Sequence, residues 1–295
     1  MPRITIPPGI EGIVELVELP DPAWADRWER IIVPGDQKDR LRNYLVFSLK
    51  HRAKLNQVAL PLHGLVILAG PPGTGKTTLA AGLANRAALD LGSPVLFVDI
   101  NPHAFPSQLL GESQRSVARL FERTLPDLAR RALPTVVLLD EVEALAVSRT
   151  GASLETNPVD VHRATDAVLA GVDHVARTCP NVTFVATTNH KAGVDGAFLS
   201  RADLIEEVGF PGAEAVRIIL ADSLRELTGR DLDEAAVASL AQECTTAQLD
   251  ARQVRKLVLR AVCERLELAQ DPTRTTVADV TAALRSSRDR LEPSV

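Results

Sequence analysis

The sequence lacks long apolar runs and a cysteine framework. No stretch reaches the roughly 18 consecutive apolar residues that a membrane-spanning helix needs, and residues 1–8 do not resemble a signal peptide. The three cysteines are odd in number and lack metal-ligand spacing, so they fit reduced thiols better than disulfides. We therefore expect a cytoplasmic protein without a membrane partner.

Blocks of positive charge are also missing. The formal net charge is −5, and no cluster of Lys and Arg interrupts the chain, so a surface for duplex DNA has no electrostatic support. Nucleic acid is therefore not an expected partner. The apolar fraction of 45% and the charged fraction of 24% are ordinary for a globular protein, which argues against a disordered chain.

The chain does have a glycine-rich loop. The short apolar segment before it (65–69) is predicted to be a strand, and the Ala- and Leu-rich segment after it (79–89) is predicted to be a helix. The loop matches the P-loop pattern G-x-x-x-x-G-K-[ST]. Backbone N–H groups of such a loop bind phosphate oxygens, its lysine reaches the β- and γ-phosphates, and its hydroxyl ligates Mg²⁺. The pattern predicts an ATP and Mg²⁺ site formed by Gly70, Pro71, Pro72, Gly73, Thr74, Gly75, Lys76, Thr77 and Thr78.

Polar side chains follow two later apolar segments. Asp140 and Glu141 follow 135–139, and Asn189 follows 182–187. Strand ends border the ligand crevice of a doubly wound sheet. We expect Asp140 to hold Mg²⁺, Glu141 to orient or deprotonate the attacking water, and Asn189 to hold that water beside the γ-phosphate. An acidic turn and an asparagine in a turn are the alternatives.

Two arginines further along are candidates for the same chemistry. Arg201 is a candidate arginine finger that would act on a neighbouring subunit, and a surface salt bridge is the alternative. Arg252 begins a helical segment in which Arg255 and Lys256 lie on nearly the same face. One cation there could couple the helical region to the nucleotide state, or the face could simply be solvated.

Apolar strand patterns alternate with helical ones up to Phe210, and only helical patterns follow. We therefore predict an α/β fold with a doubly wound parallel sheet over residues 21–210 and a small all-α lid, of about four helices, over 211–295. Residues 1–20 form a short N-terminal segment with one possible strand at 12–19. Ile32 is either a core residue or part of an adenine pocket.

The order of these motifs resembles that of the AAA+ ATPases, and in particular the pachytene-checkpoint (thyroid hormone receptor interactor) ATPases, which remodel HORMA-domain proteins. The stretches that carry the resemblance span roughly residues 19–260: LDEVEAL at 139–145, AFLSRADL at 197–204, LDAR at 249–252, and DINPH at 99–103 with ES at 112–113. The resemblance implies a homohexamer in which Asn189 is sensor 1, Arg201 the finger, Arg252 sensor 2 and Ile32 part of the adenine pocket.

The chain departs from this family in three places. Only about twenty residues precede the ATPase region, which resembles minimal bacterial members that accompany HORMA proteins in nucleotide-second-messenger anti-phage systems. A HORMA-bound nucleotidyltransferase is then a possible partner. Leu109 and Leu110 stand where the family has an aromatic pair in its central pore, and Ala251 replaces a glycine before Arg252. Residues 149–158 would be a second pore loop or an ordinary surface loop.

The sequence therefore predicts an ATP-driven remodeller that opens HORMA proteins. One alternative is an AAA+ protein acting on nucleic-acid complexes, as a helicase loader or transposition regulator, and the negative net charge argues against it. The other is a nucleotide-dependent scaffold, and Glu141 argues against it because a binding switch needs no water-positioning acid.

Overall fold

The computed structural model describes residues 12–33, 35–56, 58–101, 112–130, 133–147 and 158–289. These form two compact units. The larger takes in the described residues up to Ile31, then Gly35–Gly70 and Lys76–Val208. The smaller takes in residues 32 and 33, Pro71–Gly75, and the chain from Gly209 onward.

The larger unit is built on one six-stranded sheet with the order β1-β3-β4-β5-β2-β6. The strands are β1 (Ile13–Leu19), β2 (Leu65–Ala69), β3 (Val95–Ile100), β4 (Thr135–Leu139), β5 (Val182–Thr188) and β6 (Leu204–Glu207). All neighbours pair in parallel except β1, which lies antiparallel to β3 at the edge. The predicted α/β fold class is confirmed, with two differences: the N-terminal strand joins this sheet, and β6 has no counterpart in the prediction.

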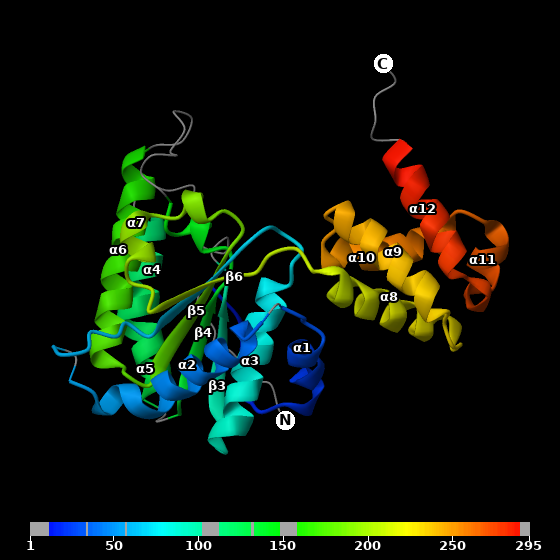
Figure 1. Cartoon of the computed structure of the whole chain (residues 1–295). Coiled ribbons are helices and arrows are strands. Elements are labelled where there is room, and N and C mark those ends of the chain that lie inside the picture. The colour runs from blue at the N-terminus through cyan, green and yellow to red at the C-terminus, as the bar shows by residue number, and fades with distance from the viewer. Residues whose placement is uncertain are drawn as a thin grey trace. The chain divides into compact units, whose positions relative to one another are not determined.

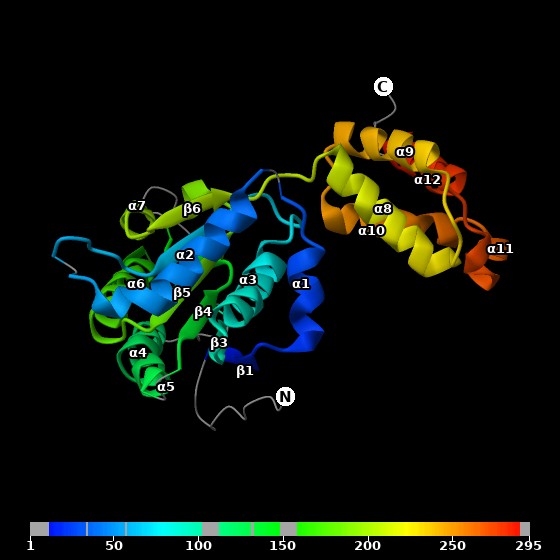
Figure 2. The same ribbon diagram turned by 60° about the horizontal axis from the view of Figure 1, so that its bottom comes forward.

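Helices cover both faces of the sheet (Figures 1 and 2). On one face lie α1 (Ala25–Glu29), α2 (Gln37–His51) and α3 (Lys76–Leu91), and on the other lie α4 (Glu112–Arg119), α5 (Leu125–Ala129) and α6 (Pro158–Thr178). Every residue of β2, β4 and β5 is buried, as expected for parallel strands covered on both sides.

The helical segment that begins at Glu112 is not regular. After α4 the chain forms a π-helical turn over Leu120–Thr124 and continues as α5. Phe121, in that turn, contacts Phe184 of β5, with 5.9 Å between ring centroids. It also packs against Gly171 of α6, where a Cβ atom would lie 2.5 Å from the Cβ of Phe121. Glycine at 171 therefore lets α6 approach the π turn closely.

The smaller unit contains five α-helices among its described residues, where about four helices were predicted. They are α8 (Ala213–Thr228), α9 (Glu234–Thr246), α10 (Ala251–Cys263), α11 (Leu266–Gln270) and α12 (Val277–Asp289). Their apolar faces form a separate core that includes Leu220, Leu240 and Val254. Within the described ranges, no helix combines the length and the apolarity needed to cross a membrane.

Candidate nucleotide site

The loop between β2 and α3 has the backbone of a phosphate-binding turn. Gly70, Gly73 and Gly75 have φ values of +155°, +80° and +92°, a region that side chains with a Cβ rarely adopt. At Gly70 the need for glycine is also steric, because a Cβ would lie 2.0 Å from the carbonyl oxygen of Val208. The loop leads into the N-terminus of α3, where the helix dipole favours an anion.

Lys76 is buried at the start of α3, with a relative exposure of 5%. Its Nζ donates hydrogen bonds to the carbonyl oxygen of Gly70 and to Oδ1 of Asn189, both at 2.8 Å. Burial lowers the pKa of Lys76, and the carboxylates of Glu143, Asp140 and Glu141 act in the opposite direction. The ammonium group is thus held at the loop, within the electrostatic influence of three carboxylates. This is a suitable position for a lysine that neutralises phosphate charge.

Oxygen atoms suited to Mg²⁺ lie beside this lysine. Thr77 Oγ1 donates to Asp140 Oδ1 at 2.8 Å, and Thr187 Oγ1 donates to the same oxygen at 2.5 Å. One carboxylate and one hydroxyl fit Mg²⁺, which is commonly bound by one or two carboxylates together with phosphates and water. No group of three or more His, Cys, Asp or Glu in the described part of the chain could hold a metal by itself.

Glu141 reaches the site through an unusual backbone conformation. Its φ is +53° and ψ +52°, left-handed values that are uncommon for a residue with a side chain. Its backbone N–H donates to Thr187 Oγ1 at 3.0 Å, and its Oε1 accepts from Asn189 Nδ2 at 3.2 Å. The extended backbone of β4 therefore does not continue through Glu141.

The site also contains residues that neither the P-loop pattern nor the strand-end pattern marks. Glu143 Oε1 accepts the backbone N–H of Asn189 at 2.9 Å, which fixes the amide beside Lys76. Its Oε2 is buried and has no hydrogen-bond partner among the described residues, so it can accept from a water molecule in the site. The hydroxyl of Thr187 links Asp140 to Glu141, because it donates to the carboxylate of Asp140 and accepts the backbone N–H of Glu141.

Asp99, at the end of β3, has its pKa raised to about 6 by burial and by the charges of Asp140 and Glu15.

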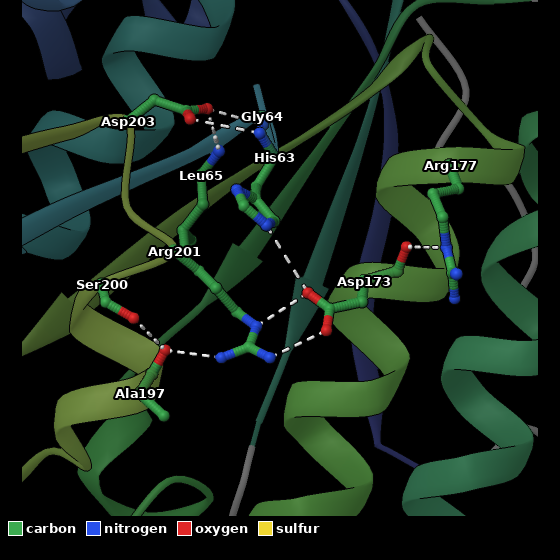
Figure 3. Close-up of polar contacts among 9 residues, drawn as sticks. All are labelled: His63, Gly64, Leu65, Asp173, Arg177, Ala197, Ser200, Arg201 and Asp203. Carbon is green, nitrogen blue, oxygen red and sulfur yellow. Dashed lines mark hydrogen bonds and ion pairs between the residues drawn. The ribbon is translucent and has the colours of Figure 1, made fainter. Parts of the chain in front are cut away.

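Arg201 lies elsewhere in the large unit. It follows α7 (Gly196–Leu199) and makes a two-point ion pair with Asp173 of α6 (Figure 3). Ile32 and Arg252 belong to the smaller unit, where Arg252 is the second residue of α10, and Thr78 follows Thr77 on α3. Leu109, Leu110 and residues 149–157 lie outside the described residues.

The large unit therefore gathers Lys76, Asp140, Glu141 and Asn189, from a P-loop and two neighbouring strand ends, into one hydrogen-bonded group. This fold and this group define a P-loop nucleotide-binding protein. The family described as "ATPase family associated with various cellular activities (AAA)" matches residues 66–210.

Similarity to known proteins identifies the family within this class. CD-NTase-associated protein 6 of Pseudomonas aeruginosa is 41% identical over 285 residues, which is 94% of this chain and 93% of that protein. The zebrafish pachytene checkpoint protein 2 homolog is 34% identical over 70% of this chain and 49% of its own length. The chain belongs to the family of AAA ATPases that includes CD-NTase-associated protein 6 and the pachytene checkpoint proteins. It spans nearly all of the former and about half of the latter.

Solved structures share the fold. The chain superposes on the structure titled C. elegans PCH-2 with a TM-score of 0.76 at 24% identity, covering 95% of this chain and 76% of that one. For a chain of the structure titled E. coli MS115-1 HORMA:CdnC:Trip13 complex, the TM-score is 0.77 at 21% identity, with coverages of 98% and 99%. At these identities the likeness concerns the fold.

Proposed function

We propose that this protein hydrolyses ATP to ADP and phosphate, with Mg²⁺, and uses the energy to open HORMA-domain proteins and disassemble their signalling complexes in an anti-phage second-messenger system. The hydrogen-bonded chain Lys76–Asn189–Glu141 carries the ATPase part, because it places a cation, an amide and an acid side by side at the P-loop. The cargo is proposed from the relatives, one of which is named for a CD-NTase and another of which is in a complex with a HORMA protein.

Each residue of the site has a role in this proposal. The backbone of Gly70–Gly75 and the Lys76 ammonium bind the β- and γ-phosphates, and Thr77 with Asp140 holds Mg²⁺, which offsets phosphate charge. Glu141 takes the proton of the attacking water, and Asn189 orients that water. Because Glu143 fixes the backbone of Asn189 and Thr187 fixes that of Glu141, both groups are oriented before the nucleotide binds.

The remaining predicted residues extend the proposal to an assembly. In a homohexamer, Arg201 reaches the γ-phosphate bound by the neighbouring subunit, Arg252 responds to the nucleotide as sensor 2, and Ile32 contacts the adenine. Leu109 and Leu110 grip the substrate chain in the central pore. The HORMA protein is the substrate, and a nucleotidyltransferase bound to it is released when it opens.

The catalytic part is tested with Glu141→Gln, which keeps the side-chain size and removes the base. We expect ATP affinity within about twofold of wild type and turnover reduced by 10²–10⁴-fold. Lys76→Ala, in contrast, should lose ATP binding. Substantial multiple turnover by Glu141→Gln would refute the assigned role of this acid.

The cargo is tested with a preassembled HORMA protein–nucleotidyltransferase complex, incubated with ATP and the ATPase and then separated by size. We expect the complex to dissociate with wild type and to remain intact with Glu141→Gln. Dissociation by Glu141→Gln in ATP would favour a scaffold whose binding suffices. An intact complex with wild type, together with ATPase stimulation by DNA, would favour a nucleic-acid role.

A further inference from the structure

The turn that carries Arg201 is bound to the start of β2, the strand next to the edge strand β6. Two residues after Arg201, the carboxylate of Asp203 accepts the backbone N–H groups of His63, Gly64 and Leu65 at 3.1, 2.6 and 3.2 Å (Figure 3). It also accepts the hydroxyl of Tyr44 at 2.5 Å. A carboxylate with four donors joins this turn to the start of β2, so the backbone at Arg201 has a fixed place on the sheet.

The guanidinium of Arg201 is held separately by α6. Nε donates to Asp173 Oδ1 at 2.7 Å and Nη2 donates to Oδ2 at 2.8 Å, the parallel two-point geometry that fixes both position and plane. Nη1 donates to the carbonyl oxygen of Ala197 at 2.7 Å. The hydrogen bonds to Arg201 keep the pKa of Asp173 below its ordinary value, so the carboxylate is charged at neutral pH.

These contacts hold Arg201 without using all of its N–H donors. A guanidinium has five N–H donors, and the three hydrogen bonds above leave one N–H on Nη1 and one on Nη2 outside them. The side chain is 22% exposed and that of Asp173 is 32% exposed, so the pair lies at the surface. His63 Nε2 is 3.6 Å from Asp173 Oδ1, and Arg177 Nε donates to the carbonyl oxygen of Asp173.

We propose that Asp173 is a positioning residue for Arg201: it holds the guanidinium in one rotamer at the subunit surface, so that its remaining donors meet the γ-phosphate bound by the neighbouring copy. The inference rests on the proposed function, in which Arg201 acts on that phosphate. An arginine free to rotate would have to be ordered at each turnover, and Asp173 provides that order in advance. Asp173 itself does not touch the nucleotide.

The test compares Asp173→Asn with Asp173→Glu, in the full chain. We expect Asp173→Asn to lower kcat about tenfold, with the KM for ATP within about twofold of wild type, because the loss concerns the transition state. Asp173→Glu keeps the charge and should lie closer to wild type. The control is Glu214→Gln on α8, which removes a carboxylate that holds Arg217 by the same two-point geometry, at 2.9 and 2.8 Å.

A double-mutant cycle separates positioning from mere support of the fold. In the Arg201→Ala background, with the residual rate followed by release of radiolabelled phosphate, Asp173→Asn should change the rate less than about twofold. A similar loss in both backgrounds, or a wild-type kcat for Asp173→Asn, would overturn the inference while leaving the proposed ATPase intact. Full turnover by Arg201→Ala would instead remove the finger role, and this inference with it.

Discussion

Replacing Asp203 should lower the free energy of unfolding more than replacing any other exposed or half-buried carboxylate described above. The reason is that its carboxylate accepts four hydrogen bonds. In Asp203→Ala, the N–H groups of His63, Gly64 and Leu65 and the hydroxyl of Tyr44 lose their acceptor. A hydrogen bond contributes about 1 kcal/mol net, and more where the acceptor is charged. Some of these donors can turn to water at this half-buried position, so we expect a loss of about 3–5 kcal/mol in the free energy of unfolding of the large unit.

Tyr44→Phe is the matched control for this prediction. It removes one of the four hydrogen bonds and the donor with it, so no unpaired hydroxyl remains, and the expected cost is about 1 kcal/mol. Burial and the charge of Asp203 raise the pKa of Tyr44, so the hydroxyl is a donor at all ordinary pH values. Asp203→Asn keeps one acceptor oxygen and should fall between the two variants.

The chain carries a convenient reporter for this measurement. Both of its tryptophans, Trp24 and Trp28, are buried in the large unit, so their fluorescence in a urea titration follows that unit alone. The free-energy change is the shift of the midpoint multiplied by the slope of the transition. Equal midpoints for Asp203→Ala and wild type, or equal losses for Asp203→Ala and Tyr44→Phe, would refute the idea that four donors share this one carboxylate.

Three further predictions concern the site. Glu143→Ala removes the acceptor for the N–H of Asn189 and should lower kcat at least tenfold with ATP affinity retained; unchanged turnover would show that this contact does not orient the amide. In the folded protein the pKa of Asp99 is about 6, above its ordinary value of 3.8, so ionisation of this carboxyl destabilises the fold as the pH increases through that range. Asp99→Asn should therefore be more stable than wild type at pH 7.5, by about 1–2 kcal/mol after allowance for solvent screening. In urea titrations this gain should shrink towards pH 4. Gly70→Ala would bring a Cβ to 2.0 Å from the oxygen of Val208, and we expect loss of ATP binding in a filter assay, with Gly92→Ala, a positive-φ glycine in open space, as the control that still binds.

The parts of the fold that the sequence predicts are those specified by neighbours along the chain. The apolar runs of β2, β4 and β5 are buried on both faces and therefore uninterrupted, and the glycines of the loop at 70–75 sit next to the lysine and threonine they serve. Placing Asp140 and Asn189 at one edge of the sheet needed only the rule that parallel strands end on the same side. The structure agrees with that placement, since β4 and β5 pair in parallel, Asp140 accepts from Thr77 and Asn189 accepts from the neighbouring Lys76.

What the sequence did not reveal depends on contacts between distant segments. β6 is four residues long and half acidic, so only its pairing with β2 makes it a strand. The antiparallel direction of β1 follows from its partner β3. Asp173 and Arg201 are 28 residues apart, and no local pattern marks the aspartate as the partner of that arginine. The left-handed backbone of Glu141 depends in the same way on Thr187, 46 residues later.

The close packing of Gly171 against Phe121 has a consequence for the surface of the protein. Asp173 lies two residues further along α6, so the depth at which this helix rests on the π turn also sets how far Asp173 stands from Arg201. An alanine at 171 would place a methyl carbon 2.5 Å from Phe121 Cβ and would force the helix outward. The distance between Asp173 and Arg201 at the surface therefore depends on the absence of a side chain at position 171 in the core.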